Sequence, residues 1–332
     1  MRRLHVEAYA DFTVKHFHEA LARGAGTRRW HEALVERHGY RLGYTATRLS
    51  LQAAGLVAKA RRRVGVHRKK RPRRPLPGMM LFQDGSTHRW LPGLGHDLDL
   101  VVTLDDPRSV ITSALLVSEE GTASSFLGLG ETIAGYGLFG SLYTDRGSRY
   151  FHTPEAGGKV SRTQLTQVGR ALAQLGIRHI ASYSPEGRGR MGRAFGTLQG
   201  RLVPAFRRAG IVTVAAANAW LRTVFVPDWN RRFGRPATEE GTAFVAYGGL
   251  PLETVLCVQE DRQVGRDNCV ARHGRSLQIP AQRHRHHDVR ATVRVHEQPD
   301  GSPAVVDGPR CLARDDAGGA LLGEDAGPRR AA

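Results

Sequence analysis

The order of periodic segments between residues 79 and 210 restricts the fold of this chain more than any other feature. Three apolar, alternating segments come first, and segments with helical and strand periodicity then alternate. The expected strands are 79–91, 97–106, 109–120, 141–145 and 177–184, and the expected helices are 124–137, 160–176 and 190–210. This order, a meander followed by βα alternation, predicts an α/β core.

The segment before this core, residues 1–57, has helical periodicity. Residues 28–38 form one expected helix that ends at Gly39, and Thr45 can cap a second helix over 45–55. Two short helices around a Gly-containing turn are typical of a helix-turn-helix, whose second helix would present Arg48 and Gln52 to DNA. A purely structural helix pair has the same pattern, so both interpretations remain open.

A basic segment, residues 58–78, links these helices to the core. The chain has 49 basic and 31 acidic residues, a net charge of +18, and ten Lys or Arg fall between Lys59 and Arg74. Prolines exclude a helix there. We interpret the segment as a linker that contacts DNA and releases counterions, with these candidate contacts: Arg61, Arg62, Arg63, Lys69 and Lys70. The alternative is a solvated segment that only keeps the protein soluble.

The C-terminal region has β character again. Short strands are expected at 252–260, 276–281, 289–298 and 304–309, with a hairpin turn at 299–302. The spacing predicts a small β-barrel or sandwich over residues 250–315. The Gly- and Ala-rich residues 316–332 are expected to be a disordered tail.

Several features indicate the compartment. No apolar run approaches the roughly 18 residues that cross a bilayer. The N-terminus lacks the apolar segment of a signal peptide, and Cys257, Cys269 and Cys311 have no metal-ligand spacing. These features predict a cytoplasmic protein, and its positive charge favours a polyanionic partner, nucleic acid before membrane.

Two acids stand out by their positions at strand ends. Asp84 ends the first expected strand and Asp145 ends the fourth, each followed by a Gly- and Ser-containing turn. Carboxylates placed in this way can converge at one edge of a sheet and hold Mg²⁺ while leaving positions open for water and phosphate. A single Asp of this kind is more often structural, so the pair is what favours a metal site.

The blocks FQDGSTH, YTDRGSRYF and SPEGRGRMGRAFGTLQGRL resemble the catalytic core of retroviral integrases and DDE transposases. The sequence is most similar to insertion-sequence transposases of the ISNCY group, and 253–270 and 289–313 also resemble that group's C-terminal region. The resemblance implies a ribonuclease-H-like fold, with a mixed five-stranded sheet and helices on both faces. It also implies a preceding helix-turn-helix and a following small all-β domain, so the domains are 1–57, 58–78, 79–235 and 250–315.

In such enzymes three carboxylates hold two Mg²⁺ ions about 4 Å apart for phosphoryl transfer on DNA. Asp84 and Asp145 match the first two acids. The third, a Glu seven residues beyond Pro185, falls on Gly192, which offers no ligand. Glu186 is a poor substitute because it precedes the helix.

Arginines flank this vacant position: Arg188, Arg190 and Arg193 are candidates for phosphate contacts. Weaker candidates complete the set. Asp105 and Asp106 are expected to cap a turn, His88 to lie near the site, and the histidines of 284–287 to form a basic surface rather than a zinc site.

The resemblance therefore predicts an Mg²⁺- or Mn²⁺-dependent transposase that acts on element ends and target DNA as a homo-oligomer. Because Gly192 replaces the third acid, catalysis is expected to be weak or lost. The alternative is a catalytically inactive DNA-binding remnant or a regulator of transposition.

Overall fold

The computed structural model describes residues 44–56, 71–155, 158–183, 189–281, 286–318 and 320–322. They divide into two compact units. In the described part, the first unit holds 44–56, residue 71, 87–98 and 189–217, and the second holds 72–86, 99–155, 158–183 and the described residues from 218 onwards. No helix of the described residues is long and apolar enough to cross a membrane.

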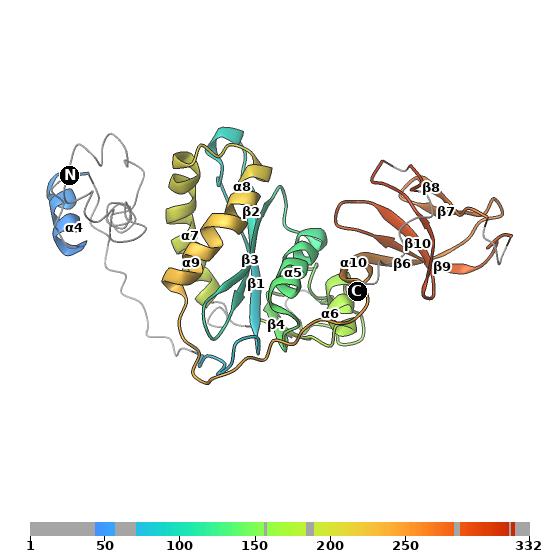
Figure 1. Cartoon of the computed structure of the whole chain (residues 1–332), viewed down its shortest axis with the longest axis horizontal. Coiled ribbons are helices and arrows are strands. Elements are labelled where there is room, and N and C mark those ends of the chain that lie inside the picture. The colour runs from blue at the N-terminus through green and yellow to red at the C-terminus, as the bar shows by residue number, and fades with distance from the viewer. Residues whose placement is uncertain are drawn as a thin grey trace, which may run out of the picture. The chain divides into compact units, whose positions relative to one another are not determined.

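The second unit is built on a five-stranded sheet (Figure 1). Its strands are β1 (Leu81–His88), β2 (Leu98–Asp105), β3 (Ile111–Val117), β4 (Ser141–Thr144) and β5 (Arg178–Ala181), in the order β3-β2-β1-β4-β5. β2 and β3 pair antiparallel, whereas β4 pairs parallel with β1 and with β5. The predicted mixed sheet of a ribonuclease-H-like α/β core is confirmed by this order.

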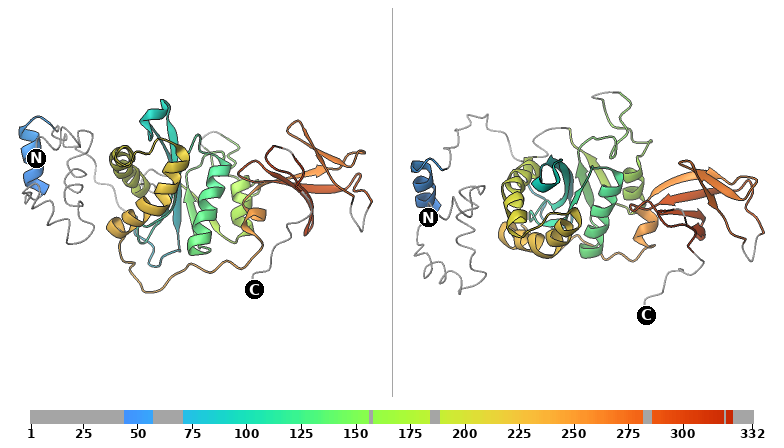
Figure 2. Two further views of the ribbon diagram at one scale, coloured as in Figure 1. Left: turned by 45° about the horizontal axis from the view of Figure 1, so that its top comes forward. Right: turned by 90° about the horizontal axis from the view of Figure 1, so that it is seen from above.

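Helices cover both faces of the sheet. Helix α5 (Thr122–Tyr136) and helix α9 (Val226–Phe233) lie on opposite faces (Figures 1 and 2). Helix α6 (Gln167–Gln174) packs beside α5, and their apolar residues share one buried cluster with the strands. Burial of this cluster is the main stabilising contribution in this part of the chain, and it includes the following residues: Leu81, Phe126, Leu129, Ile133, Leu142, Val168 and Leu172.

The helix expected over 160–176 is shorter than predicted, because α6 begins at Gln167. Thr166 caps it: its Oγ1 accepts a hydrogen bond from the Gly169 amide at 3.1 Å and donates to the Tyr150 carbonyl at 2.9 Å. This cap satisfies the first turn and fixes where the helix starts.

The edge strand β3 is covered by two asparagine side chains. Asn230 Oδ1 accepts from the Ile111 amide and its Nδ2 donates to the Ile111 carbonyl, both at 2.8 Å. Asn218 makes the same pair of bonds with Leu116, at 2.6 and 2.9 Å. The free backbone groups of an edge strand can pair with another chain. These two side chains occupy them.

A π-helical turn sets the two asparagines in phase. They are twelve residues apart (230 minus 218), so a regular helix of about 100° per residue would leave them about 120° out of phase. Between α8 (Val214–Trp220) and α9 lies the π-helical turn Leu221–Phe225, which takes up about one extra residue. That reduces the difference to about 20°, so both amides can face β3.

A connector after α9 pairs with the start of the core. The Ala243 amide donates to the Pro77 carbonyl at 2.7 Å, and Leu138 and Val245 exchange both backbone bonds. Nearby, Arg73 Nη1 donates to the carbonyls of Asp106 and Pro107. The expected linker over 58–78 is therefore ordered at its C-terminal end, because backbone groups of the core bind it there.

The C-terminal β region has a four-stranded antiparallel sheet and a two-stranded one. The first has the order β11-β10-β9-β6 and the second pairs β7 with β8; the strands are β6 (Val258–Gln263), β7 (Cys269–Arg272), β8 (Arg275–Gln278), β9 (Thr292–Glu297), β10 (Pro303–Asp307) and β11 (Arg310–Arg314). Both sheets contribute to one buried apolar cluster.

The sequence predictions for this β region are partly right. The hairpin turn at 299–302 is present between β9 and β10, with Gly301 at φ 84°. The strand expected from Leu252 is wrong in its first half, because residues Leu252–Val255 form the short helix α10 after Pro251. Strands β7 and β11 were not predicted.

The described part of the first unit is mainly helical. It includes α4 (Tyr44–Ala53), the 3₁₀ turn η1 (Pro92–Leu94) and α7 (Gly189–Arg208). α7 confirms the helix expected over 190–210, and these apolar residues are buried: Met191, Phe195, Leu198, Leu202 and Phe206. The first helix of the expected helix-turn-helix, 28–38, lies outside the described residues, so that motif stays a prediction.

We expect Asn230→Ala to lower the free energy of unfolding by about 1–3 kcal/mol, because it removes two hydrogen bonds that cover the edge of β3. Chemical denaturation measures the loss. The matched control is Arg231→Ala on the same helix: this side chain is 72% exposed and its ion pair is with Asp228, so its removal should change stability by less than about 0.5 kcal/mol. Equal effects of the two substitutions would contradict the role of Asn230.

Candidate functional site

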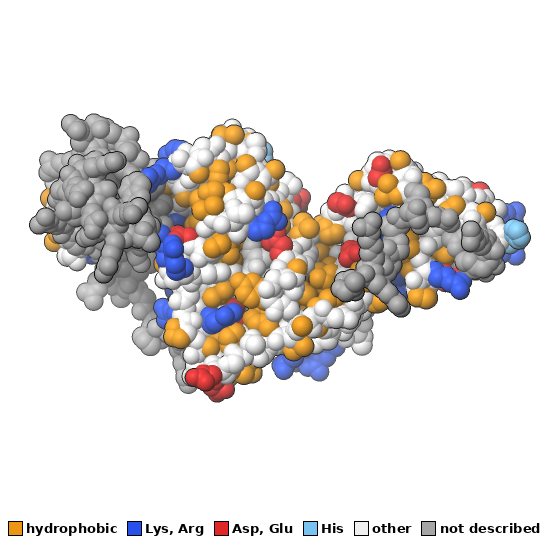
Figure 3. All heavy atoms as spheres, in the orientation of Figure 1, with side chains coloured by type: hydrophobic (Ala, Val, Ile, Leu, Met, Phe, Trp, Pro, Cys, Tyr) orange, Lys and Arg blue, Asp and Glu red, His pale blue; other side chains and the backbone are white. Residues whose placement is uncertain are grey.

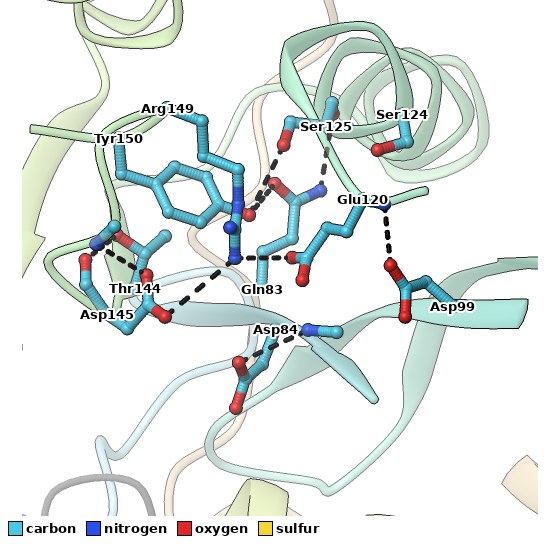
Figure 4. Close-up of polar contacts among 12 residues, drawn as sticks. Gln83, Asp84, Asp99, Glu120, Ser124, Ser125, Thr144, Asp145, Arg149 and Tyr150 are labelled. Carbon is cyan, nitrogen blue, oxygen red and sulfur yellow. Dashed lines mark hydrogen bonds and ion pairs between the residues drawn. The ribbon is translucent and has the colours of Figure 1, made fainter. Parts of the chain in front are cut away.

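Asp84 lies within β1, and Asp145 directly follows the neighbouring parallel strand β4. The expectation that Asp84 ends its strand is wrong, because β1 continues to His88. Phe82 of β1 is in register with Tyr143 of β4, and each acid comes two residues later. Because parallel strands run in one direction, both carboxylates reach the same edge of the sheet (Figure 4). The structure therefore brings the two predicted site residues together.

A buried hydrogen-bond network anchors β1 immediately before Asp84. Gln83 Nε2 donates to Thr103 Oγ1 at 3.2 Å and to the Ser125 carbonyl at 3.3 Å. Tyr150 Oη donates to Gln83 Oε1 at 3.2 Å. Buried polar groups are costly unless they are paired, so these bonds hold β1, β2, α5 and the segment after β4 in one arrangement around Asp84.

A third carboxylate, that of Glu120, lies beside this pair. The Glu120 amide donates to Asp99 Oδ2 at 2.7 Å, which fixes the backbone after β3. Its side chain fills the space next to Gly85, where a Cβ atom would stand 2.1 Å from Glu120 Oε2. The glycine that follows Asp84 therefore leaves the room that the Glu120 carboxylate occupies.

Arg149 lies between Glu120 and Asp145 (Figure 4). Its Nη2 is 2.7 Å from Glu120 Oε1 and 3.8 Å from Asp145 Oδ2. The guanidinium also packs over the Tyr150 ring, 4.6 Å from the ring centre. One cation thus contacts two of the three carboxylates.

The pKa of Glu120 reflects the balance of charges in this cluster. The pKa of Glu120 is raised from 4.5 to about 7: burial is the largest cause, Arg149 lowers the pKa, and the carboxylates of Asp84, Asp145 and Asp99 raise it. The positive charge of Arg149 therefore does not fully offset burial and the neighbouring acids. Perturbed carboxyl groups of this kind are typical of functional sites, although structural ion pairs also produce them.

His179 on the neighbouring strand β5 contacts the last residue of β4, Thr144. Its Nε2 is 3.0 Å from Thr144 Oγ1, which donates to the Asp145 carbonyl at 3.0 Å. Because the Thr144 hydroxyl donates its only proton to the Asp145 carbonyl, His179 Nε2 has to carry the hydrogen and donate it to Thr144 Oγ1. The ring stacks on Phe151 at 4.0 Å, and burial lowers the pKa of His179 to about 4. A neutral imidazole therefore positions the backbone of Asp145.

Gly192 lies on α7, exposed, with nothing within 4 Å of the position a Cβ would take. Arg193 Nε donates to the Gly189 carbonyl at 3.0 Å within the same helix, and Arg190 Nη2 donates to the Arg71 carbonyl at 2.5 Å. Glu186 and Arg188 lie outside the described residues, as do the basic candidates of 61–70.

Other candidate residues have separate surroundings. Asp105 is buried and accepts from the Gly78 amide and from Arg108 Nε, and Asp106 accepts from the Arg74 amide. Burial raises the pKa of Asp105. These bonds agree with the expected turn-capping role. His88 packs edge-on against buried Trp90.

The candidate DNA contacts of α4 are accessible. Arg48 is exposed and Gln52 is half-buried. On the face of the described part shown in Figure 3, Lys and Arg side chains form separate small groups rather than one continuous patch. His284 lies outside the described residues, whereas His286 and His287 are exposed. In the described part of the chain, no group of three or more His, Cys, Asp or Glu could hold a metal ion.

Glu120 and Arg149 are the residues that sequence reasoning missed. Both stood inside blocks that were noticed, one at the end of the third strand and one four residues after Asp145. A pair of consecutive acids after a buried strand was the available signal for Glu120. Nothing in the spacing indicated that Arg149 would meet it, because the contact joins segments that are distant in the chain.

The side chains that the structure describes do not form the three-carboxylate metal site that the resemblance implies. Within the described residues, no group of three or more His, Cys, Asp or Glu is arranged to hold a metal ion. Asp84 and Asp145 offer the hard oxygen ligands that Mg²⁺ prefers. Glu120, however, is paired with Arg149, and position 192 has no side chain.

Comparison with known proteins finds two relatives named as transposases. The chain is 30% identical over 236 residues to transposase y4bF of Sinorhizobium fredii, which covers 70% of this chain and 51% of that protein. It is 29% identical over 164 residues to the transposase for insertion sequence IS1202 of Streptococcus pneumoniae, which covers 49% of this chain and 35% of that protein. The chain is therefore similar to transposases, and it spans about half the length of the first relative and about a third of the second.

No protein-family model matches the chain. Among solved structures, the catalytic core domain of HTLV-2 integrase in complex with magnesium overlaps 44% of this chain and 86% of its own, with 15% sequence identity and a TM-score of 0.33. The strand order described above, rather than this overlap, carries the fold assignment.

We expect the free energy of unfolding to fall as the pH is lowered from about 6.5 towards 4. The pKa of His179 is lower in the folded state than in the unfolded chain, so the unfolded chain binds the proton first and gains stability by up to about 1.4 kcal/mol per pH unit. His179→Phe keeps the ring but cannot bind a proton, so its profile should be flatter. Urea denaturation between pH 4.5 and 7.5 measures both. His296, whose pKa burial also lowers to about 4, leaves a residual slope in the variant; an unchanged slope would contradict the assignment.

Proposed function

We propose that this chain is a DNA transposase of the DDE type, related to the ISNCY group, whose phosphoryl-transfer site is impaired. The observation that carries the proposal is the placement of Asp84 and Asp145 at one edge of adjacent parallel strands, in a sheet of ribonuclease-H-like order. The similarity to two transposases supports it. The proposed reaction is cleavage of element ends and transfer of the cut strand to target DNA.

The proposed cofactor is Mg²⁺ or Mn²⁺, held by Asp84 and Asp145 together with phosphate oxygens of the substrate. Such an ion supplies charge neutralisation at the reacting phosphate. The chain's own contribution is to position the two carboxylates: the Gln83 network anchors Asp84, and the Gly147 amide, which donates to Asp145 Oδ1 at 2.9 Å, orients Asp145.

Impairment is proposed because, among the residues that the structure describes, no unpaired third carboxylate lies beside Asp84 and Asp145. Gly192 has no side chain that could coordinate a metal ion, and the carboxylate of Glu120 is paired with Arg149 at 2.7 Å. The second candidate function is therefore a catalytically inactive protein that binds element ends and regulates transposition. The exposed Arg48 of α4 and the net charge of +18 favour retained DNA binding under either candidate.

Each segment of the chain has a proposed role in DNA binding or cleavage. Residues 1–57 would bind DNA through a helix-turn-helix, 58–78 would contact the phosphate backbone, 79–235 would form the catalytic core and 250–315 would assist binding. The proposed partners are element terminal repeats, target DNA and further copies of this chain, in the bacterial cytoplasm near the nucleoid.

We expect Gly192→Glu to increase cleavage of element-end DNA in Mg²⁺ or Mn²⁺ by at least about tenfold, because it restores a carboxylate at the expected position. The open space around residue 192 accepts a side chain, and replacing Gly also favours the helix by roughly 1 kcal/mol. A gel assay of end-labelled duplex measures the cut strand.

Two controls define this experiment. In Gly192→Gln the new side chain is nearly the same size as Glu but has no charge, so this variant should not cleave the DNA. Adding Asp145→Ala to Gly192→Glu should abolish the gained cleavage. If the natural chain already cuts, and Asp145→Ala alone removes this activity, the account of Gly192 is wrong. If no variant cuts but all bind the DNA, the regulatory function is favoured.

We expect binding to element-end DNA to weaken steeply with salt, because phosphate contacts release counterions. Replacing Arg61, Arg62 and Arg63 together by Gln should reduce the slope of log K against log salt by up to about 3. Fluorescence anisotropy between 50 and 300 mM salt, with a scrambled duplex as control, measures this slope. An unchanged slope would remove these residues from the interface.

A further inference from the structure

The carboxylate cluster contains its own cation. The guanidinium of Arg149 lies 2.7 Å from a carboxylate oxygen of Glu120 and 3.8 Å from one of Asp145. A divalent ion held by Asp145 would compete for the same negative charge. The arrangement therefore raises the question of what Arg149 does at this edge of the sheet.

Arg149 cannot be neutralised to make way for another cation. A guanidinium keeps its proton at any physiological pH, and the Glu120, Tyr150 and Asp145 groups raise the pKa of Arg149 despite its partial burial. A positive charge of this permanence repels a metal ion at close range. Either Arg149 moves when a metal binds, or the metal binds weakly.

The contacts of Arg149 are those of a group that can exchange partners. Its Nε atom is buried without a hydrogen-bond partner, and Glu120 Oε1 likewise has none in spite of the short distance to Nη2. A structural Arg–carboxylate pair usually forms two parallel hydrogen bonds. In this pair Nη2 of Arg149 approaches Glu120 Oε1 at 2.7 Å, while the buried Nε makes no hydrogen bond.

The position of Glu120 shows that the pair is built into the site. The Glu120 carboxylate occupies the space that Gly85 leaves beside Asp84, and Asp99 fixes its backbone. The Arg149 side chain is only 21% exposed and packs over Tyr150, whose hydroxyl belongs to the Gln83 network. Both partners are thus held at the cluster by neighbouring groups.

We propose that Arg149 is a tethered counter-ion of the Asp145–Glu120 carboxylates, which competes with divalent metal ions and lowers their affinity for this site. Arg149 stabilises the cluster of acids when no metal is bound, and a metal ion has to displace it from Asp145. This proposal rests on the proposed function only in the choice of a divalent metal ion as the ligand, because it concerns metal binding and not DNA cleavage.

The test is direct Mn²⁺ binding to the full chain, measured by the electron paramagnetic resonance signal of free Mn²⁺. We expect weak binding by the natural chain and binding at least about tenfold tighter for Arg149→Gln, since one unit charge near 4 Å is removed from the site. Arg149→Lys keeps the charge and should stay close to the natural chain. Asp145→Asn should abolish the gain in the Arg149→Gln background.

A second variant removes the charge pair as a whole. Glu120→Gln with Arg149→Gln leaves the net charge of the cluster unchanged and avoids an unpaired buried carboxylate, so it guards against a failure of Arg149→Gln to fold. We expect it to bind Mn²⁺ more tightly than the natural chain, and its melting temperature to rise with Mn²⁺ while that of the natural chain changes little.

The outcomes separate this inference from the proposed function. If the natural chain binds Mn²⁺ as tightly as both Arg149 variants, in a manner that needs Asp145, the counter-ion role is overturned and the metal-dependent function stands. If no variant binds Mn²⁺, both are overturned. If Arg149→Gln raises the Mn²⁺ affinity by the same factor whether or not Asp145→Asn is also present, the metal ion does not bind at Asp145, and the counter-ion role is overturned.

Discussion

The parallel pairing of β1 with β4 is the constraint on which the rest of the candidate site depends. It joins strands that are far apart in the chain, and its register sets Asp84 and Asp145 at one edge. Parallel strands require crossover helices, and α5 serves that purpose while burying Phe126 and Leu129 against the sheet. The same crossover positions Ser125 to accept a hydrogen bond from Gln83.

Bringing acids together at a buried edge has an electrostatic consequence. Carboxylates that share a site repel each other, and burial adds a desolvation cost. Glu120 shows this cost in its raised pKa of about 7. Arg149 reduces it from within the chain, and the Gly147 amide does so for Asp145. The site is therefore organised around the compensation of negative charge, whichever cation finally provides it.

Much of the core could be predicted from sequence because its elements are strongly periodic. The five strands and α5 were expected, and the stripe from Met191 to Phe206 on α7 is buried. Boundaries decided by a single side chain were missed: Thr166 shortens α6 by capping it. Strands β7 and β11 were missed because they are short, and α9 because its π-helical turn interrupts the regular period.

The sequence alone determined the α/β class, the two acids on the first and fourth strands and the glycine at 192, since these depend on local periodicity and on residue identity. Only the tertiary structure decided which groups surround the acids. Glu120 reaches Asp84 through the space at Gly85, and Arg149 meets Glu120 across the sheet edge. Such contacts arise from strand order and crossover packing, which bring together residues whose separation along the chain has no characteristic period.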